Sequence, residues 1–140
     1  SLFKATGLVF KPCTEIYTYI EVSRLSPIAQ YKSVSLNMLK SHQVLYNCSA
    51  ETAEAQTNNW PFRYIHGKRT RYEASRRVYR ELLVSDYGIG IIGVRKDMPL
   101  EREGTDIVAI PVRDVPAYYF GYLSRPEPFS VLAQAFLRLL

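Results

Sequence analysis

The chain is poor in the residues that build metal sites and disulfide frameworks. It holds two cysteines, two histidines and one tryptophan among 140 residues. Cys13 and Cys48 have no metal-binding or redox spacing, and two thiols do not indicate a disulfide framework. His42 and His66 are isolated from other ligand types. We therefore expect a reducing compartment and no bound metal.

Long apolar runs and catalytic motifs are missing as well. No stretch reaches the length of a membrane span, and no charged and then apolar leader opens the chain. The sequence therefore predicts a cytoplasmic protein without a membrane partner. Nucleophile elbows, phosphate-binding glycine loops and metal signatures are not found either. No catalytic residue and no cofactor is predicted, so the sequence argues against an enzyme.

The composition that remains is that of one packed domain. Hydrophobic residues make up 47% of the chain and charged residues 22%, which suffices for a single core. Eleven tyrosines suggest apolar walls with polar tips, and a net charge of +5 mildly favours anionic partners. Because the chain starts at Ser1 without Met and ends at Leu140 inside an apolar helical pattern, we expect a piece of a longer protein.

The hydrophobic pattern predicts strands and helices in alternation. In the segment Glu15 to Ser23, every second residue is suited to a buried face, and these residues are Ile16, Thr18, Ile20 and Val22. Further strands are expected at 8–10, 44–46, 89–92, 107–112 and 118–123, and helices at 35–39, 50–56, 75–86 and 130–140. Ser35 and Ser130 are expected to be the N-caps of the first and the last of these helices. This alternation is typical of an α/β fold with a largely parallel sheet.

The stretch from Arg71 to Gly93 is the most informative. Ser75 is a good helix N-cap, and Gly88 is expected to close the helix in the left-handed conformation. A short β-branched strand, buried on both faces, follows. Such a strand–helix–strand unit places a helix N-terminus at the carboxyl end of a parallel sheet, where ligands bind in open α/β folds. The sequence thus predicts a small-molecule site at this edge.

Three blocks of the chain resemble, in the same order, the effector-binding (substrate-binding) domain of LysR-type bacterial transcriptional regulators. The blocks are EIYTYIEVSRLSPIAQYKSVSLNMLKSHQVLYN, YEASRRVYRELLVSDYGIGIIG and IVAIPVRDVPAYYFGYLSRPEPFSVLAQAFLRLL. The chain departs from the family at Ser26-Pro27, where a His-Pro pair is usual, and at Gly93-Val94, where a proline often closes the strand. A helix-turn-helix segment and the first half of lobe one are not present in it.

The resemblance implies an α/β, periplasmic-binding-protein-like lobe with a mixed, largely parallel sheet flanked by helices. Residues 15–112 would form the second subdomain, and residues 1–14 and 113–140 would belong to the first. The implied function is to sense a small, anionic metabolite. The protein would also self-associate as a dimer or larger oligomer, and it would contact DNA only through a domain missing from this chain.

The effector site is expected to use six residues at the strand ends and the helix start, namely Asn47, Ser49, Glu73, Ser75, Arg76 and Tyr118. For Ser75 this role comes from the resemblance at YEAS, and capping alone would also explain the residue. Turn chemistry would equally explain Asn47 and Ser49, and Glu73 could simply pair with an arginine. Of Tyr118 and Tyr119, one is expected to face the cleft and the other the core.

Two other functions remain open on the sequence. The basic stretch 63–80 could neutralise phosphates of a nucleic acid, although a solvated helix face with an Arg77–Glu81 pair explains it as well. Because cations oppose the dipole at a helix start, Arg76 and Arg77 also fit a docked anion. Alternatively, the lobe could bind protein partners through helix 75–86 and the sheet edge, without a ligand.

Overall fold

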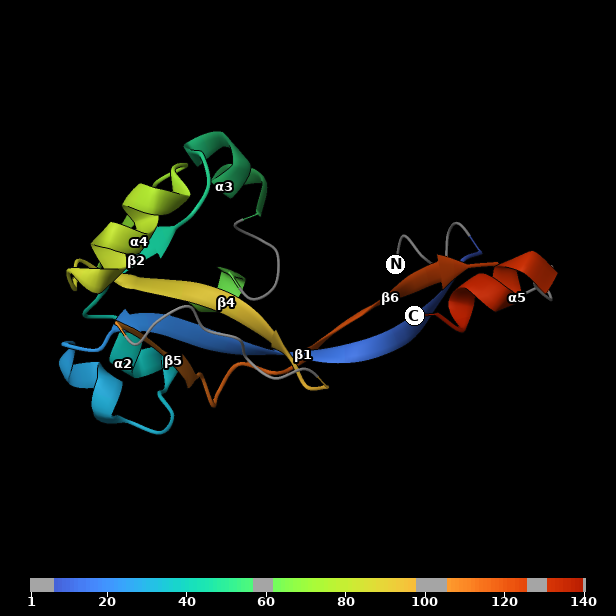
Figure 1. Cartoon of the computed structure of the whole chain (residues 1–140), viewed down its shortest axis with the longest axis horizontal. Helices are drawn as coiled ribbons and strands as arrows, with labels where there is room; N and C mark the ends of the chain where they lie inside the picture. Colours follow the sequence, from blue (N-terminus) through green and yellow to red (C-terminus); the bar gives the residue numbers. More distant parts are fainter. Residues whose placement is uncertain (1–6, 57–61, 98–105, 126–130, 140) are drawn as a thin grey trace.

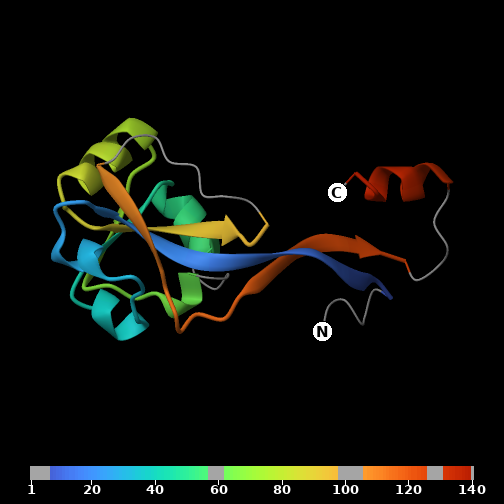
Figure 2. The ribbon, with the colours of Figure 1, turned by 60° about the horizontal axis from the view of Figure 1, so that its bottom comes forward.

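The computed structural model describes residues 7–56, 62–97, 106–125 and 131–139, which form an α/β lobe and a long arm (Figures 1 and 2). The strands are β1 (Val9–Ser23), β2 (Gln43–Tyr46), β3 (Arg69–Tyr72), β4 (Ile89–Arg95), β5 (Ile107–Pro111) and β6 (Tyr118–Ser124). The helices are α2 (Leu36–Leu39), α3 (Ala50–Gln56), α4 (Arg76–Val84) and α5 (Val131–Leu137), with 3-10 turns η1 (Pro27–Gln30) and η2 (Phe62–Tyr64).

The strands form one mixed sheet with the order β3-β2-β4-β1-β5. β2 runs parallel to β3 and β4, whereas β1 is antiparallel to β4, β5 and β6. Helices flank this sheet, so the predicted α/β class with a mixed sheet is confirmed. The parallel part holds the strand–helix–strand unit β3-α4-β4 that the sequence predicted.

β1 belongs to both the lobe and the arm. Its second half lies between β4 and β5, with Ile20 opposite Ile91 and Ile110, and its first half pairs with β6 alone. The sequence predicted two separate strands here, at 8–10 and 15–23. The structure joins them through a register shift between Pro12 and Thr14. Proline cannot donate to the ladder, and it is tolerated at an irregularity of this kind.

The hydrophobic core lies on one face of the sheet, beneath η1 and α2. Ile16, Thr18, Ile20 and Val22 point into this side and are each at most 2% exposed, as the alternation predicted. Ile28 of η1 and Leu39 of α2 belong to the same core cluster as Ile20 and Val22. Ser35 was expected to cap α2, but its side chain makes no cap hydrogen bond. Asp114 replaces it, because its carboxylate accepts a hydrogen bond from the amide of Leu36 at 2.8 Å.

α4 covers the opposite face of the sheet. Its cap is confirmed, since the hydroxyl of Ser75 accepts a hydrogen bond from the amide of Val78 at 3.4 Å. The prediction that Gly88 closes this helix is wrong, because Asp86 takes the left-handed conformation with φ of 60°. Gly88 instead allows close packing on β2, where an added Cβ would lie 2.6 Å from the carbonyl oxygen of Gln43.

The arm consists of the first half of β1, β6 and α5, and it extends away from the lobe in both views (Figures 1 and 2). Large apolar side chains are exposed along it, and they are Val9, Phe10, Phe120, Leu123, Val131, Leu132, Phe136 and Leu139. The cap expected for α5, at residue 130, lies outside the described residues. In the part of the chain that the structure describes, every helix is too short or too polar to cross a bilayer.

Candidate ligand-binding site

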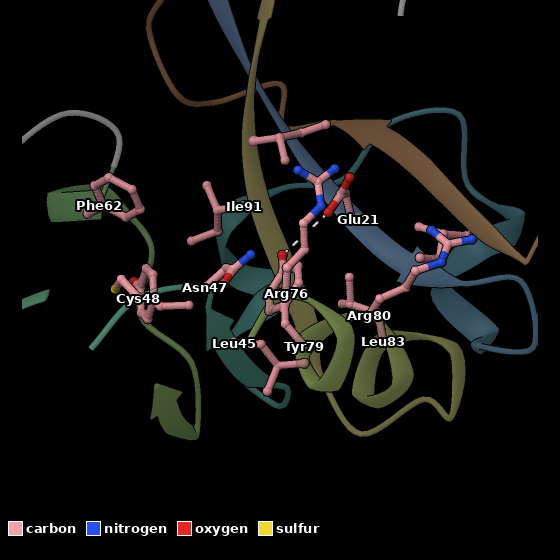
Figure 3. A pocket seen from close by; sticks show the side chains of 13 residues that line it. Glu21, Leu45, Asn47, Cys48, Phe62, Arg76, Tyr79, Arg80, Leu83 and Ile91 are labelled. Atoms are coloured by element: carbon pink, nitrogen blue, oxygen red, sulfur yellow. Dashed lines mark hydrogen bonds between the residues drawn. The ribbon is translucent and has the colours of Figure 1, made fainter. Parts of the chain in front are cut away.

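A cavity of about 350 Å³ lies at the carboxyl end of β2, beside α4 and β4 (Figure 3). Its lining comes from β1, β2, β4, β5, η2 and α4, and from the residues that follow β2. These residues are Glu21, Leu45, Tyr46, Asn47, Cys48, Phe62, Arg76, Tyr79, Arg80, Leu83, Ile91, Ile92 and Ile107. The cavity thus lies around the carboxyl end of β2, where Tyr46 and Ile91 reach it from the core side of the sheet and Leu45 and Glu21 from the side of α4.

The contribution of α4 follows from helix geometry. Arg76, Tyr79, Arg80 and Leu83 are spaced by three or four residues, so they share one face of the helix. Leu83 is fully buried against the sheet, while the other three side chains carry the polar groups of this wall. Ser23 fixes the end of the helix, because its hydroxyl donates a hydrogen bond to the carbonyl of Val84 at 2.9 Å.

A polar pair links α4 to β1 inside the cavity. The hydroxyl of Tyr79 donates a hydrogen bond to Oε2 of Glu21 at 3.3 Å (Figure 3). Burial raises the pKa of Tyr79, and the nearby negative charge of Glu21 raises it further. Tyr79 is therefore a stable donor at physiological pH. Gly90 makes the contact feasible, since an added Cβ there would overlap the Tyr79 hydroxyl.

Aromatic rings form the wall near the end of β2. Tyr46 stacks on Tyr72 with ring centroids 5.7 Å apart and meets Phe62 at 5.3 Å in a tilted geometry. Burial raises the pKa of Tyr46 to about 12, so its hydroxyl stays neutral. Burial also raises the pKa of the Cys48 thiol, which lowers the fraction of nucleophilic thiolate. This wall is suited to packing rather than to chemistry.

The first turn of α4 is positively charged. It holds Arg76 and Arg77 and no acidic residue, although cations at this end oppose the helix dipole. Arg77 is offset by an exposed ion pair with Glu81, at 3.5 Å. Arg76 has no ion pair or hydrogen bond with any other described residue, and its side chain lines the cavity. The cavity therefore carries one unbalanced cation at a helix N-terminus.

The structure brings four of the six predicted site residues to one region. Asn47 and Arg76 line the cavity, and Glu73 and Ser75 lie just before α4. Glu73 orders this turn, because its Oε1 accepts the amide of Ser75 at 3.1 Å and its Oε2 lies 3.9 Å from Nη2 of Arg71. Contact of these residues with an effector stays a prediction.

The other two predicted residues lie elsewhere. Ser49 begins α3, where its hydroxyl accepts a hydrogen bond from the amide of Thr52 at 3.3 Å. Tyr118 opens β6 opposite Ile16, half-buried, and is not among the described lining of the cavity. Its neighbour Tyr119 is exposed and donates a hydrogen bond to Glu15 at 2.9 Å.

Sequence reasoning missed the sheet side of the cavity and most of its helical wall. Neither Glu21 nor Tyr79 was among the six residues expected at the site. A signal was present, because Tyr79 and Arg80 follow Arg76 at helical spacing. No local sequence signal pointed to Phe62 or Ile107, since only the tertiary fold brings them to the cavity.

The basic stretch 63–80 is spread over η2, β3 and α4. Several of its cations have local partners. Arg63 lies 4.9 Å from the ring centre of Tyr64 and donates to its hydroxyl, and Arg71 and Arg77 pair with acidic residues. Among the residues that the structure describes, no group of three His, Cys, Asp or Glu side chains could hold a metal ion.

Comparison with known proteins gives no match to any family model or to any curated protein. Solved structures do match. HinK, a LysR family transcriptional regulator from Pseudomonas aeruginosa, is 10% identical with a TM-score of 0.63, over 95% of this chain and 47% of HinK. The chain thus spans about half the length of that regulator.

Two isolated regulatory domains match over most of the chain as well. The effector-binding domain of QuiR in complex with shikimate is 16% identical, with a TM-score of 0.56 over 95% of this chain and 63% of that one. The regulatory domain of Synechocystis PCC6803 CcmR in complex with 2-PG is 17% identical, with a TM-score of 0.60 over 94% and 64%. These proteins are regulators or regulatory domains rather than enzymes.

At such identities the comparisons establish the fold. The mixed sheet and the helices on both of its faces belong to an architecture shared with those domains. The chain therefore has the periplasmic-binding-protein-like fold of LysR-family regulatory domains, as the three sequence blocks indicated.

Proposed function

We propose that this chain is the larger part of the effector-binding domain of a LysR-type transcriptional regulator and senses a small anionic metabolite. Residues 15–112 would form the second subdomain, and residues 1–14 and 113–140, which include the arm, would belong to the first. Such a protein would act in the cytoplasm and contact DNA through another domain. Support comes from the shared fold and from structural neighbours that hold shikimate and 2-PG.

The observation that carries the anionic effector is the position of Arg76. It stands in the first turn of α4, faces the cavity and lacks an acidic partner among the described residues. A bound anion would satisfy both the guanidinium and the positive end of the helix dipole. Asn47, from the end of β2, would add a neutral hydrogen-bonding group beside it.

Ligand binding would act by shifting populations. An effector held between the two subdomains would favour the closed arrangement over the open one by its difference in affinity for them. β1 and β6 connect the lobe to the arm, so they are the segments through which the two subdomains would move. An oligomer would pass this shift to the DNA-binding domains.

Calorimetry on the complete two-lobed protein tests this function. We expect one or more small carboxylates from a metabolite panel to bind, and Arg76→Gln to weaken that binding about tenfold or more, as is common for a charge-assisted contact. Arg77→Gln is the matched control, because Arg77 lies next in the chain and pairs with Glu81 on the surface. Absence of binding across all metabolite classes would refute the proposal.

A further inference from the structure

We propose that the effector is an amphipathic monoanion, in which a single carboxylate is joined to an apolar body the size of a ring or a medium-length alkyl chain. This inference rests on the proposed function, because it names the class of ligand for the same cavity. Three features of the cavity carry it: the composition of its walls, the separation of its polar and apolar ends, and the charge of Glu21.

Nearly half of the side chains in the cavity wall are wholly apolar. Six lining side chains have no polar atom, and they are Leu45, Phe62, Leu83, Ile91, Ile92 and Ile107. A purely polar ligand would leave this surface in contact with water, whereas an apolar body would remove it from water at a gain of affinity. The volume of about 350 Å³ also falls within the range of small-molecule sites.

The aromatic ring of Phe62 and the charged side chains lie at different ends of the cavity. Figure 3 shows Phe62 and Cys48 at one side and Glu21, Tyr79 and Arg76 toward the other. The aromatic side is reinforced by the contact of Phe62 with Tyr46 at 5.3 Å. A ligand that places its carboxylate at Arg76 would therefore lay its body toward the aromatic wall.

Glu21 limits the charge of the ligand head. Its carboxylate is held at the polar end by the Tyr79 hydroxyl, at 3.3 Å. The Glu21 carboxylate would repel a monoanionic head through one charge and a dianionic head through two. The cavity should therefore prefer a carboxylate to a phosphate monoester with the same apolar body.

Titration of the complete two-lobed protein by NMR tests the inference with acetate, hexanoate, octanoate and octyl phosphate as probes. Each further buried CH₂ group should tighten binding about fourfold, because it contributes about 0.8 kcal/mol. Octanoate should bind more tightly than octyl phosphate at a pH where the phosphate is doubly charged. The shifted resonances should include Leu45, Ile91 and Ile92.

Variants separate the body from the head. Phe62→Ser should weaken octanoate binding but leave acetate unchanged, and Glu21→Gln should selectively improve octyl phosphate binding. Arg76→Gln should weaken every anion, with Arg77→Gln as the control. Equal affinity for acetate and octanoate would overturn the amphipathic class while leaving an anionic effector intact.

Two other results would also be decisive. Octanoate binding that is insensitive to Arg76→Gln would refute the anionic effector itself, and the inference with it. Shifts confined to Phe120, Leu123 and Phe136 would place octanoate on the arm, which would overturn the assignment to the cavity. No shift at any cavity residue up to the solubility limit of octanoate would overturn the inference as well.

Discussion

At the scale of single residues, Gly90 decides the shape of the cavity. It lies on β4 opposite Glu21, and its missing side chain leaves room for the Tyr79 ring to cross the strand. Three residues from three elements thus meet in one contact. The sequence showed a glycine between isoleucines, but nothing local revealed that a tyrosine from α4 occupies the space above it.

Gly90→Ala should destabilise the lobe by about 1–3 kcal/mol, the usual cost of inserting a methyl group into packed space. Tyr79→Phe should cost about 1 kcal/mol through loss of its hydrogen bond. Gly90→Ala should destabilise the lobe less in the Tyr79→Phe background than in the wild type, since the hydroxyl that overlaps the added methyl group is gone. Urea unfolding of the two single variants and the double variant measures this, and strictly additive costs would contradict it.

At the scale of elements, polar contacts hold the ends of β1, β4 and β6 together where the arm leaves the lobe. Glu15 accepts hydrogen bonds from Tyr17 and Tyr119, each at 2.9 Å, and pairs with Lys96 at 3.1 Å. The hydrogen bond from Lys96 is the main reason that the pKa of Glu15 is lowered, and those from Tyr119 and Tyr17 add to it. This cluster fixes the segment beside the register shift.

The stability contributed by Glu15 should depend on pH. Because its pKa is lower in the folded chain than its ordinary 4.5, the contribution is present above pH 4.5 and is lost as the pH falls through the folded value. Glu15→Gln should therefore lower the melting temperature at neutral pH, and the gap to the wild type should close below about pH 4.5. Thermal melts across this range provide the measurement.

Glu81→Gln is the control for this experiment, because Glu81 forms an exposed pair with Arg77 within α4, at 3.5 Å. Its effect should be small at every pH. A gap between Glu15→Gln and the wild type that stays constant down to about pH 3 would show that Glu15 acts by packing and not by charge.

Several elements could be predicted because their signals are local. The alternation in β1 and the Ser75 cap depend on neighbouring residues, and the structure confirms both. The cap expected at Ser35 failed because the group that replaces it is distant in sequence: Asp114 caps α2 across the fold. Asn47 and Arg76 could be predicted as site residues because they stand at a strand end and at a helix start. Glu21 could not, because only the order of the strands brings it to the cavity.

At the scale of the whole molecule, the arm leaves much apolar surface uncovered. Its side chains include Phe120 at 61%, Leu132 at 82% and Phe136 at 61% exposure, and contiguous apolar surface of this kind marks an interface. In the complete protein, the remainder of the first subdomain would cover it. In the isolated chain, this apolar surface can be buried by contact with a second copy of the chain.

We therefore expect the isolated chain to self-associate with increasing concentration. Light scattering should show a mass above 16.1 kDa, and Leu132→Glu with Phe136→Glu should shift the chain toward monomer by charging the exposed face of α5. Leu25→Glu, at an equally exposed position in the lobe, is the control and should leave association unchanged. A strict monomer at high concentration would contradict the expectation.

The continuity of β1 has a mechanical consequence. Glu21, at the floor of the cavity, and Val9, deep in the arm, lie on one backbone about 40 Å apart at the usual rise per residue. The irregularity between Pro12 and Thr14 divides this strand into a longer part in the lobe and a shorter part in the arm. If the strand tilted as a rigid rod by about 5° about its Glu21 end, Val9 would move through about 3 Å, so a small adjustment at the cavity would become a larger displacement in the arm.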